Sequence, residues 1–340
     1  MVSYSMNVYV LFIIPVFAEA NLVSPYIKTK VIPELQTCTE NTFNGVITHF
    51  ENVSNIGCSE RCSSHPICRR YMYDKESRLC TLFESGENCI THERVDNKLC
   101  YKQKSVCGAT KCTRCPIGYY GEHCQHIIRD CKDGFDKELH PDRITLSYIQ
   151  PVVNGPVVEA KCIFKLNGRL YIHFRKTDCL EVDFNKTFDE YANGFGNPVG
   201  NYFLGLEHIY NILQGPDRVL SIEFGLTTGL KAKGFAKKIQ ISSKDTGYKI
   251  YFDNFNPYSS GDSLTNLRGR PFSTFDRDNT SYICPERFGG GWWYKNDNVC
   301  SRGNINGKRV GNNFESTWHW QDDLGTNTSF SYIFMRIKVL

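Results

Sequence analysis

The stretch from Leu267 to Gly307 reads LRGRPFSTFDRDNTSYICPERFGGGWWYKNDNVCSRGNING, and the interpretation of the whole chain starts from it. Asp276 and Asp278 lie two residues apart, as in loops that surround a hard cation with oxygen ligands. Cys284 and Cys300 have a spacing that allows a disulfide across the intervening loop. Three glycines lie between these cysteines, followed by Trp292, Trp293 and Tyr294. These three rings supply aromatic faces beside that loop. The stretch therefore combines three features of a binding site: a cation loop, a covalent staple and aromatic rings.

The N-terminus has the pattern of a secretory signal peptide. Val8–Phe17 is a short apolar run, and the small residues Ala18 and Ala20 follow it, so residues 1–20 are expected to be removed after Ala20. The run has roughly 10 residues, fewer than the ~20 needed to cross a bilayer. No later segment is long and apolar enough to do so. The mature chain is therefore expected to be secreted and extracellular, with no transmembrane segment.

Cysteine content and charge agree with this location. Sixteen cysteines in a secreted chain indicate disulfides, and the net charge of +4 is not gathered into long runs, which argues against a nucleic-acid partner. The most basic stretch, Lys231–Lys249, is interpreted as solvated strand faces, with contact to an anionic glycan or surface as the alternative. Four sequons for N-glycosylation are present, at Asn52, Asn185, Asn279 and Asn327.

The first group of cysteines lies within residues 35–103. Residues 54–65 are expected to form a short helix in which Cys58 and Cys62, four apart, share one face. Strands are expected around Tyr71 and around Leu82, joined by a polar turn. This arrangement, a helix on a small sheet, resembles the PAN/apple module. The resemblance implies the disulfides Cys58–Cys80, Cys62–Cys68 and Cys38–Cys100, and leaves Cys89 as an extra cysteine.

The second group occupies residues 104–127 and contains Cys107, Cys112, Cys115 and Cys124. Its end, with eight residues between the last two cysteines and glycines that allow a tight backbone, resembles the final loop of an EGF-like module. The unit is truncated, with four cysteines instead of six. A zinc or redox site at Cys112 and Cys115 is the alternative, but no second CxxC lies nearby.

Residues 128–340 resemble the fibrinogen C-terminal family, which includes fibrinogens, ficolins, tachylectins, tenascins and angiopoietins. Val182–Ile212 carries an acidic-aromatic turn, a GFGN turn and a Leu-Gly-Leu-Glu helix start, and the opening stretch and the C-terminal strand also match. The resemblance implies disulfides Cys131–Cys162 and Cys284–Cys300. The segment Phe164–Phe174 departs from the family pattern but alternates as a strand. The expected fold class is α+β: a multi-domain, disulfide-rich protein with a mixed antiparallel sheet and short helices in this last domain.

An enzyme is not expected. The chain has no HExxH, GxSxG or P-loop motif, and Gly289–Gly291 precedes aromatic residues rather than a helix carrying Lys-Ser. His319 lies between two tryptophans, where a packed or surface role is expected rather than that of a base. Cys89 and Cys179 remain after the implied pairs are assigned. They are available for pairing with each other, for pairing between chains or for a different connectivity of the EGF-like unit, so a homo-oligomer is one expectation.

Calcium is the one cofactor that the resemblance implies. The family binds it with two Asp side chains two residues apart; Asp278 matches the first, whereas the second position is Thr280, which lacks a carboxylate. Asp276 is the candidate replacement. Because affinity follows the charge of the ligands, the loop predicts a weakened calcium site. The alternative is a solvated turn held by Asx hydrogen bonds.

A ligand pocket is expected beside this loop. In the ficolin and tachylectin branch, a shallow cleft binds acetyl groups of sugars with an aromatic wall and backbone N–H groups near the second cysteine of the last pair. Ser301 replaces a residue that is often His there, and the segment before Cys300 is longer than usual. For the tryptophans of this region, core packing is the competing interpretation. By position, the pocket residues are Arg287, Phe288, Val299, Cys300, Ser301, Phe314 and Trp318.

Two functions follow from this resemblance. The first is lectin-like binding of acetylated glycans, in innate defence. The second is a matrix, adhesion or receptor-ligand role in which the same domain contacts an extracellular protein. The departures of the pocket and of the calcium loop from the family pattern favour the second function.

Overall fold

The computed structural model describes residues 26–31, 46–64, 68, 70–83, 89–90, 98–103, 106–107, 111–139, 144–177, 182–198, 200–309, 313–320 and 330–340. The expected signal peptide, Cys38, Cys179 and the sequon at Asn327 lie outside these residues. Within them, no helix has the length and apolar character that crossing a membrane requires.

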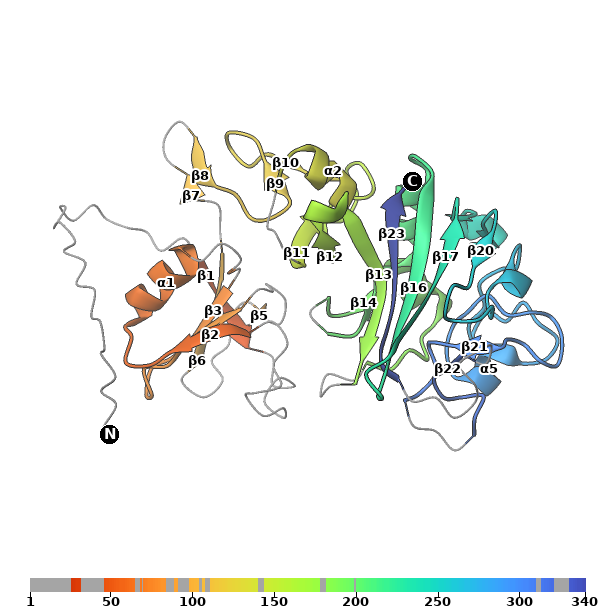
Figure 1. Ribbon diagram of the computed structural model, residues 1–340. Coiled ribbons are helices and arrows are strands. Elements are labelled where there is room, and N and C mark those ends of the chain that lie inside the picture. The colour runs from red at the N-terminus through yellow and green to blue at the C-terminus, as the bar shows by residue number, and fades with distance from the viewer. Residues whose placement is uncertain are drawn as a thin grey trace, which may run out of the picture.

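The N-terminal part is a six-stranded sheet in the order β2-β4-β3-β6-β1-β5, accompanied by one helix (Figure 1). Disulfides join Cys58 to Cys80 and Cys62 to Cys68, and so attach the helix α1 to the sheet at two points of its buried face. These are two of the pairs that the PAN/apple resemblance implied. The elements are β1 (Tyr26–Val31), β2 (Val46–Phe50), α1 (Asn55–Ser64), β3 (Arg70–Asp74), β4 (Cys80–Phe83), β5 (Cys89–Ile90) and β6 (Lys98–Gln103).

The middle of the chain consists of two short hairpins, the second of which packs against the domain that follows. Cys115 is bonded to Cys124. Gly118 has a φ of +104°, and an added Cβ would lie 1.9 Å from the carbonyl oxygen of Tyr148, so glycine is required there. The carbonyl of Gly118 accepts a hydrogen bond from the backbone N–H of Ile128 at 2.9 Å. The strands are β7 (Val106–Cys107), β8 (Cys112–Arg114), β9 (Tyr119–Tyr120) and β10 (His126–Ile127).

The C-terminal domain is built on a sheet in the order β11-β12-β13-β23-β16-β17-β20, with β14 and β15 as a side branch (Figure 1). All its described strand pairs are antiparallel. The last strand of the chain, β23, lies in the middle of the sheet between β13 and β16. The main strands are β11 (Thr145–Ile149), β12 (Val158–Ile163), β13 (Arg169–Lys176), β14 (Phe195–Gly196), β15 (Tyr202–Phe203), β16 (Arg218–Leu226), β17 (Lys231–Lys237), β20 (Phe255–Asn256) and β23 (Phe330–Val339).

Short helices and long loops cover one face of this sheet and form the core with it. Thr187 and Glu190 form a capping box, which satisfies two N-terminal N–H groups of α3. Core residues come from strands, helices and loops alike, including Trp292 and Trp320, so loop packing holds much of the domain together. The remaining elements are α2 (Cys131–Asp136), η3 (Phe164–Leu166), α3 (Phe188–Asn193), α4 (Leu206–Leu213), β18 (Gln240–Ile241), η4 (Lys244–Thr246), β19 (Ile250–Tyr251), η5 (Thr265–Leu267), α5 (Cys284–Phe288), β21 (Gly303–Asn304) and β22 (His319–Trp320).

The strand expected over Phe164–Phe174 begins later than its alternation suggested. Residues 164–166 form the 3₁₀ turn η3, and Asn167 then adopts a left-handed conformation, with a φ of +60°. Gly168 follows with a φ of +61°, so the strand starts at Arg169. The Asn-Gly pair, which tolerates positive φ, therefore overrides the hydrophobic alternation.

Candidate functional site

The expected site is organised around the disulfide between Cys284 and Cys300, whose Cα atoms lie 5.6 Å apart. Cys284 opens the one-turn helix α5, with proline at its next position and Gly289 closing it in a left-handed conformation. Cys300 lies at the end of a polar turn and also has a positive φ of +59°. The backbone N–H of Lys295 donates to the carbonyl of Cys300 at 2.8 Å, which closes this turn.

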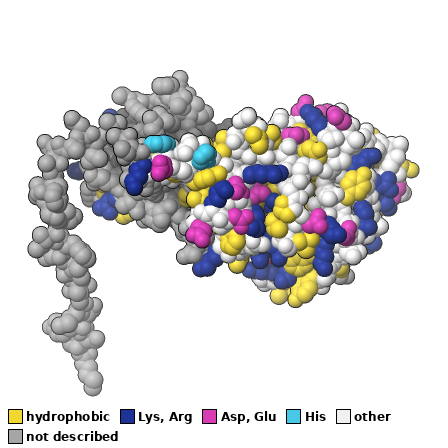
Figure 2. Space-filling view, turned by 90° about the horizontal axis from the view of Figure 1, so that it is seen from above, with side chains coloured by type: hydrophobic (Ala, Val, Ile, Leu, Met, Phe, Trp, Pro, Cys, Tyr) yellow, Lys and Arg dark blue, Asp and Glu magenta, His cyan; other side chains and the backbone are white. Residues whose placement is uncertain are grey.

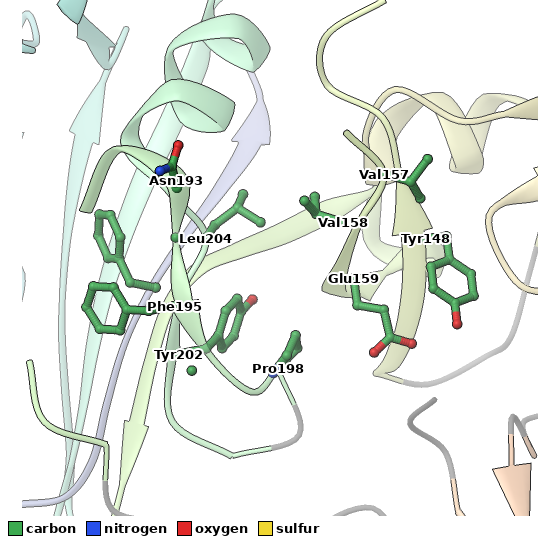
Figure 3. A pocket seen from close by; sticks show the side chains of 12 residues that line it. Tyr148, Val157, Val158, Glu159, Asn193, Phe195, Pro198, Tyr202 and Leu204 are labelled. Carbon is green, nitrogen blue, oxygen red and sulfur yellow. The ribbon is translucent and has the colours of Figure 1, made fainter. Parts of the chain in front are cut away.

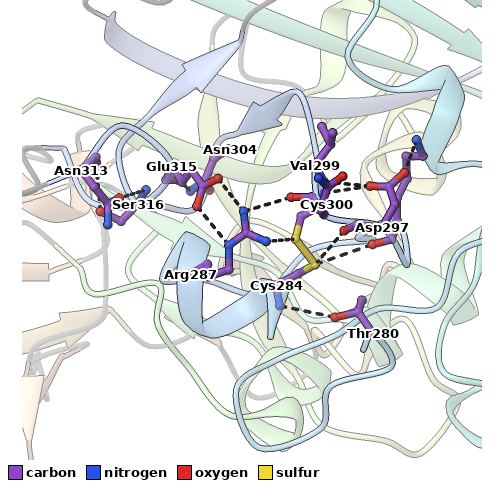
Figure 4. Close-up of polar contacts among 12 residues, drawn as sticks. Thr280, Cys284, Arg287, Asp297, Val299, Cys300, Asn304, Asn313, Glu315 and Ser316 are labelled. Carbon is purple, nitrogen blue, oxygen red and sulfur yellow. Dashed lines mark hydrogen bonds and ion pairs between the residues drawn. A yellow bond between two sulfur atoms is a disulfide. The ribbon is translucent and has the colours of Figure 1, made fainter. Parts of the chain in front are cut away.

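Arg287 fills the space beside the disulfide (Figure 4). Its Nε and Nη2 donate to the two carboxylate oxygens of Glu315 at 3.1 and 2.6 Å, a bidentate pair. The same Nη2 donates to the carbonyl of Asn298 at 3.0 Å, and Nη1 lies 3.3 Å from Sγ of Cys300. The guanidinium, expected to border a ligand pocket, therefore joins α5 to two loops of the protein itself: that of Glu315 and that of Asn298 and Cys300.

The backbone donors expected to hold an acetyl group have internal partners. Oδ1 of Asp297 accepts from the N–H groups of Val299 and Cys300 at 3.1 and 3.0 Å. The hydrogen bond from Lys295 and, after it, the backbone donors keep the pKa of Asp297 below its ordinary value. Ser301 is buried, and its hydroxyl donates to the carbonyl of Gly303 at 2.7 Å. A ligand would have to displace Asp297 to reach these N–H groups.

The aromatic residues near the site are mainly core. Trp292, Trp293 and Trp318 are all buried, as the core-packing interpretation expected. Phe288 is buried as well, so its ring forms no open wall. Phe314 is half-buried and lies 4.3 Å, between ring centroids, from His319.

His319 and His173 are buried histidines of this region. Burial lowers the pKa of His319, and it lowers the pKa of His173 to about 3. Nε2 of His173 lies 2.9 Å from Oδ1 of Asn306, in the turn after β21. Both rings are therefore neutral at physiological pH and serve packing and hydrogen bonding.

Exposed apolar side chains flank the disulfide. Ile283 is 58% exposed, Tyr282 42% and Val299 49%. The first two precede Cys284 and the third precedes Cys300, so the disulfide brings them together. Ile283 has a φ of +47°, which is a strained conformation for a β-branched residue. We call Tyr282, Ile283 and Val299 the apolar patch; no periodic pattern of hydrophobic residues predicts it.

The carboxylates expected to hold calcium accept hydrogen bonds from the protein itself. Oδ1 of Asp276 accepts from the N–H of Phe188, at the start of α3, at 3.0 Å, and from the hydroxyl of Thr274 at 2.7 Å. Oδ1 of Asp278 accepts from the N–H of Thr280 at 2.8 Å, as in an Asx turn. In the described part of the chain, no group of three or more His, Cys, Asp or Glu side chains is placed to hold a metal ion. The hydrogen bond at Asp278 is the one expected of an Asx turn, and the weakened calcium site stays a prediction.

Calcium is accordingly expected to stabilise this chain very little. A site with millimolar affinity gains only about 0.4 kcal/mol from 1 mM calcium. Adding 1 mM calcium to EDTA-treated protein should therefore raise the Tm, measured by differential scanning fluorimetry, by less than about 2 °C. Magnesium at the same concentration is the control. A calcium-specific rise of several degrees would show a competent site despite the loss of the second carboxylate.

A cleft that the sequence did not predict lies at the other side of the domain (Figure 3). It has a volume of about 350 Å³. β12 pairs with β13 near Leu170, whereas β15 pairs with β13 near His173. β12 and β15 therefore diverge, and the cleft lies between them. The lining residues are Tyr148, Val157, Val158, Glu159, Asn193, Gly194, Phe195, Gly196, Pro198, Tyr202, Phe203 and Leu204.

These features define a class of protein: an α+β domain closed by disulfides, in which loops form the expected site at one end. The family model "Fibrinogen beta and gamma chains, C-terminal globular domain" matches residues 127–340. The chain therefore belongs to this family, as the sequence resemblance predicted. The PAN/apple-like and EGF-like assignments of the N-terminal part stay predictions.

Several curated relatives share this domain. Tenascin-R of Gallus gallus is 31% identical over 201 residues, which are 57% of this chain and 14% of that protein. Angiopoietin-2 of Rattus norvegicus is 30% identical over 184 residues, 53% of this chain and 36% of that protein. The chain thus spans only a minor part of the length of these relatives. The fibrinogen-like globe domain of human ANGPTL6 superposes with a TM-score of 0.56 at 26% identity, covering 68% of this chain and 99% of that one.

Proposed function

We propose that this chain is a secreted, non-enzymatic protein that uses the end of its fibrinogen-like domain to contact another extracellular protein, in matrix adhesion or as a receptor ligand. The observation that carries the proposal is the apolar patch on the Cys284–Cys300 disulfide. The similarity to tenascin-R and angiopoietin-2 supports a matrix or receptor-ligand role over lectin activity.

The patch has the physical character of a protein-binding hot spot. A tyrosine and two aliphatic side chains stay exposed although apolar burial would stabilise the domain. The disulfide and the strained backbone at Ile283 fix their positions, which lowers the entropy lost on binding. The ion pair of Arg287 with Glu315 borders the patch and supplies a polar rim.

Lectin-like binding of acetylated sugars has less support. The backbone donors at Val299 and Cys300 are occupied by Asp297, and Arg287 fills the space beside the disulfide. A sugar would have to break these bonds and leave Asp297 without its partners.

The N-terminal units are proposed as accessory modules. The PAN/apple-like module, expected over residues 35–103, also takes in β1, which pairs with β6. Residues 104–127 are the proposed EGF-like unit, ahead of the domain at 128–340. The described part of the chain contains no free cysteine, so if the chain forms a homo-oligomer, the PAN/apple-like module is the proposed contact between chains. A monomer mass for the secreted protein in light scattering would rule this contact out.

The test measures binding of the full secreted chain to cultured cells and to the matrix that they deposit. The variant Ile283→Asn/Val299→Gln removes the apolar patch, and asparagine tolerates the left-handed backbone at 283. Its affinity should fall at least about tenfold, because buried apolar anchors dominate interface energies. Pretreating the cells with a protease should also abolish binding, whereas N-acetylglucosamine should not compete.

The matched control is Val153→Gln/Leu230→Gln, which removes two exposed aliphatic side chains elsewhere on the same domain. This variant should bind as the parent chain does. Competition by N-acetylglucosamine together with full binding by the Ile283→Asn/Val299→Gln variant would overturn the proposal and restore the lectin interpretation.

A further inference from the structure

The central sheet of the fibrinogen-like domain has two chemically different faces. Strand registers assign side chains to them, because directly paired residues point to the same side. Leu170 pairs with Ile337 and Ile222 with Met335, and these four are buried in the main core. The other face carries the alternate residues, and most of them are half-exposed.

Basic side chains dominate this second face. On strands β12, β13, β16, β17 and β23 the acidic ones are Glu159 and Glu223. The basic ones are Lys161, Arg169, Lys176, Lys231, Lys233, Lys237, Arg336 and Lys338. We call this surface the basic face. The net charge of the whole chain is only +4, so the face concentrates positive charge that the rest of the molecule offsets.

Aromatic rings lie between these cations. Phe174 and Phe334 stack with centroids 6.1 Å apart, and Phe334 stacks on Tyr332 at 5.6 Å. Nζ of Lys161 lies 3.9 Å from the centroid of Phe174, and the guanidinium of Arg336 lies 4.8 Å from that of Phe334. The rings hold the stems of the cations along the sheet and keep their charged ends towards solvent.

The central acid of the face is already neutralised. Glu223 accepts from Nη2 of Arg336 and from the hydroxyl of Tyr332, both at 3.2 Å. Arg169 has a buried Nε without a hydrogen-bond partner, and burial together with the charge of Arg336 lowers its pKa. Like charges are thus held close together, an arrangement that an added anion would relieve.

The register also divides the basic stretch Lys231–Lys249. Lys231, Lys233 and Lys237 alternate onto the basic face, opposite Gly225, Glu223 and Val219. Lys244 and Lys249 come after β17 in the sequence and lie outside the strands of the basic face. Figure 2 shows Lys and Arg side chains interspersed with hydrophobic ones on the visible surface of this domain.

We propose that the basic face binds a linear sulfated polysaccharide of the glycosaminoglycan class. Charge complementarity selects a polyanion, and a second copy of this face would be repelled. The five strands span about 19 Å at ~4.8 Å per strand, which suits a chain of several sugar rings rather than a single anion. The half-exposed rings of Phe174 and Tyr332 offer apolar contact to sugar faces, whereas Phe334 between them is buried. This site is independent of the apolar patch.

The experiment uses the full secreted chain and immobilised heparin at 150 mM NaCl. The variant Lys231→Gln/Lys233→Gln/Lys338→Gln removes three charges without disturbing the aromatic rings. The matched control, Lys165→Gln/Lys244→Gln/Lys308→Gln, removes three charges from elements that pack on the core side. Heparin affinity should fall at least about tenfold in the first variant and stay unchanged in the second.

Salt and competitor complete the test. Binding a polyanion releases its counterions, so the slope of log Kd against log salt should be about 2 to 3 smaller in the basic-face variant. Chemically desulfated heparin should bind much more weakly than heparin. No retention of the parent chain, equal losses in both triple variants, or equally tight binding of single-stranded DNA would each overturn the proposal. A glycan-binding role at this face would survive failure of the patch experiment, since the two variants share no residue.

Discussion

Replacing Asp130 with alanine is expected to lower the free energy of unfolding of the fibrinogen-like domain by about 3–5 kcal/mol. Oδ2 of Asp130 pairs with Nη2 of Arg218 at 2.6 Å, and the two side chains are only 4% and 3% exposed. Nε and Nη1 of Arg218 have no hydrogen-bond partner. Without Asp130 the guanidinium would stay buried and uncompensated, which is far costlier than losing an exposed ion pair.

Asp130 also caps the helix α2. Its Oδ1 accepts from the N–H groups of Lys132 and Asp133 at 2.8 and 2.9 Å. Asp130→Asn retains the capping ability and removes the charge, so it separates the cap, worth about 1 kcal/mol, from the ion pair. The measurement is urea unfolding followed by tryptophan fluorescence.

A double-mutant cycle supplies the control. Arg218→Met combined with Asp130→Asn removes both charges and should recover much of the stability that either single substitution loses. If Asp130→Asn alone lowers the free energy of unfolding by less than about 1 kcal/mol, water reaches Arg218 and the ion pair contributes little to stability.

The second large effect is expected at Arg175. This buried guanidinium lies 4.3 Å from the ring centroids of both Phe184 and Trp318, between them, and Nη1 donates to the carbonyls of Ile305 and Gly307 at 3.0 and 2.6 Å. Arg175→Ala leaves two carbonyls unsatisfied and a cavity between two rings. These costs together should lower the free energy of unfolding by about 3–5 kcal/mol.

Two further variants make this expectation specific. Arg277→Ala also removes a cation from an aromatic face, 4.1 Å from the centroid of Phe188, but Arg277 is exposed, so it should cost less than about 1 kcal/mol. Arg175→Lys keeps the charge but not the planar fork, and should recover less than half of the loss. Equal stability of Arg175→Ala and the parent chain would contradict the stacked arrangement. Tryptophan emission should change in Arg175→Ala alone, because Trp318 loses its partner.

Local sequence patterns predicted the local structure well. The helix expected over residues 54–65 appears as Asn55–Ser64, since the two cysteines of its buried face and a polar opposite face specify it. The tryptophans near the site are core, as their size and apolar character favour. The strand over Phe164–Phe174 was wrong at its start, because alternation does not reveal that Asn167 and Gly168 take positive φ.

The functional surfaces depend on contacts between distant parts of the chain. Arg287 was expected to border a pocket, and its partner Glu315 lies 28 residues away, in a loop that no motif marks. The basic face requires the register of β23 against both β13 and β16, which lie far from it in sequence. Long-range pairing cannot be read from periodicity, because each strand alone is compatible with several partners.

The sequence by itself determined the family, the modular cysteine pattern and the identity of the core aromatics, because residue type and spacing constrain turns, disulfides and burial directly. The tertiary structure alone decided that the N–H groups expected to bind an acetyl group are bonded to Asp297. It also decided that three exposed apolar side chains lie next to the last disulfide, and that the lysines and arginines of five strands lie on one face. Each of these depends on where separate segments meet in space, and that is set by the packing of the whole domain.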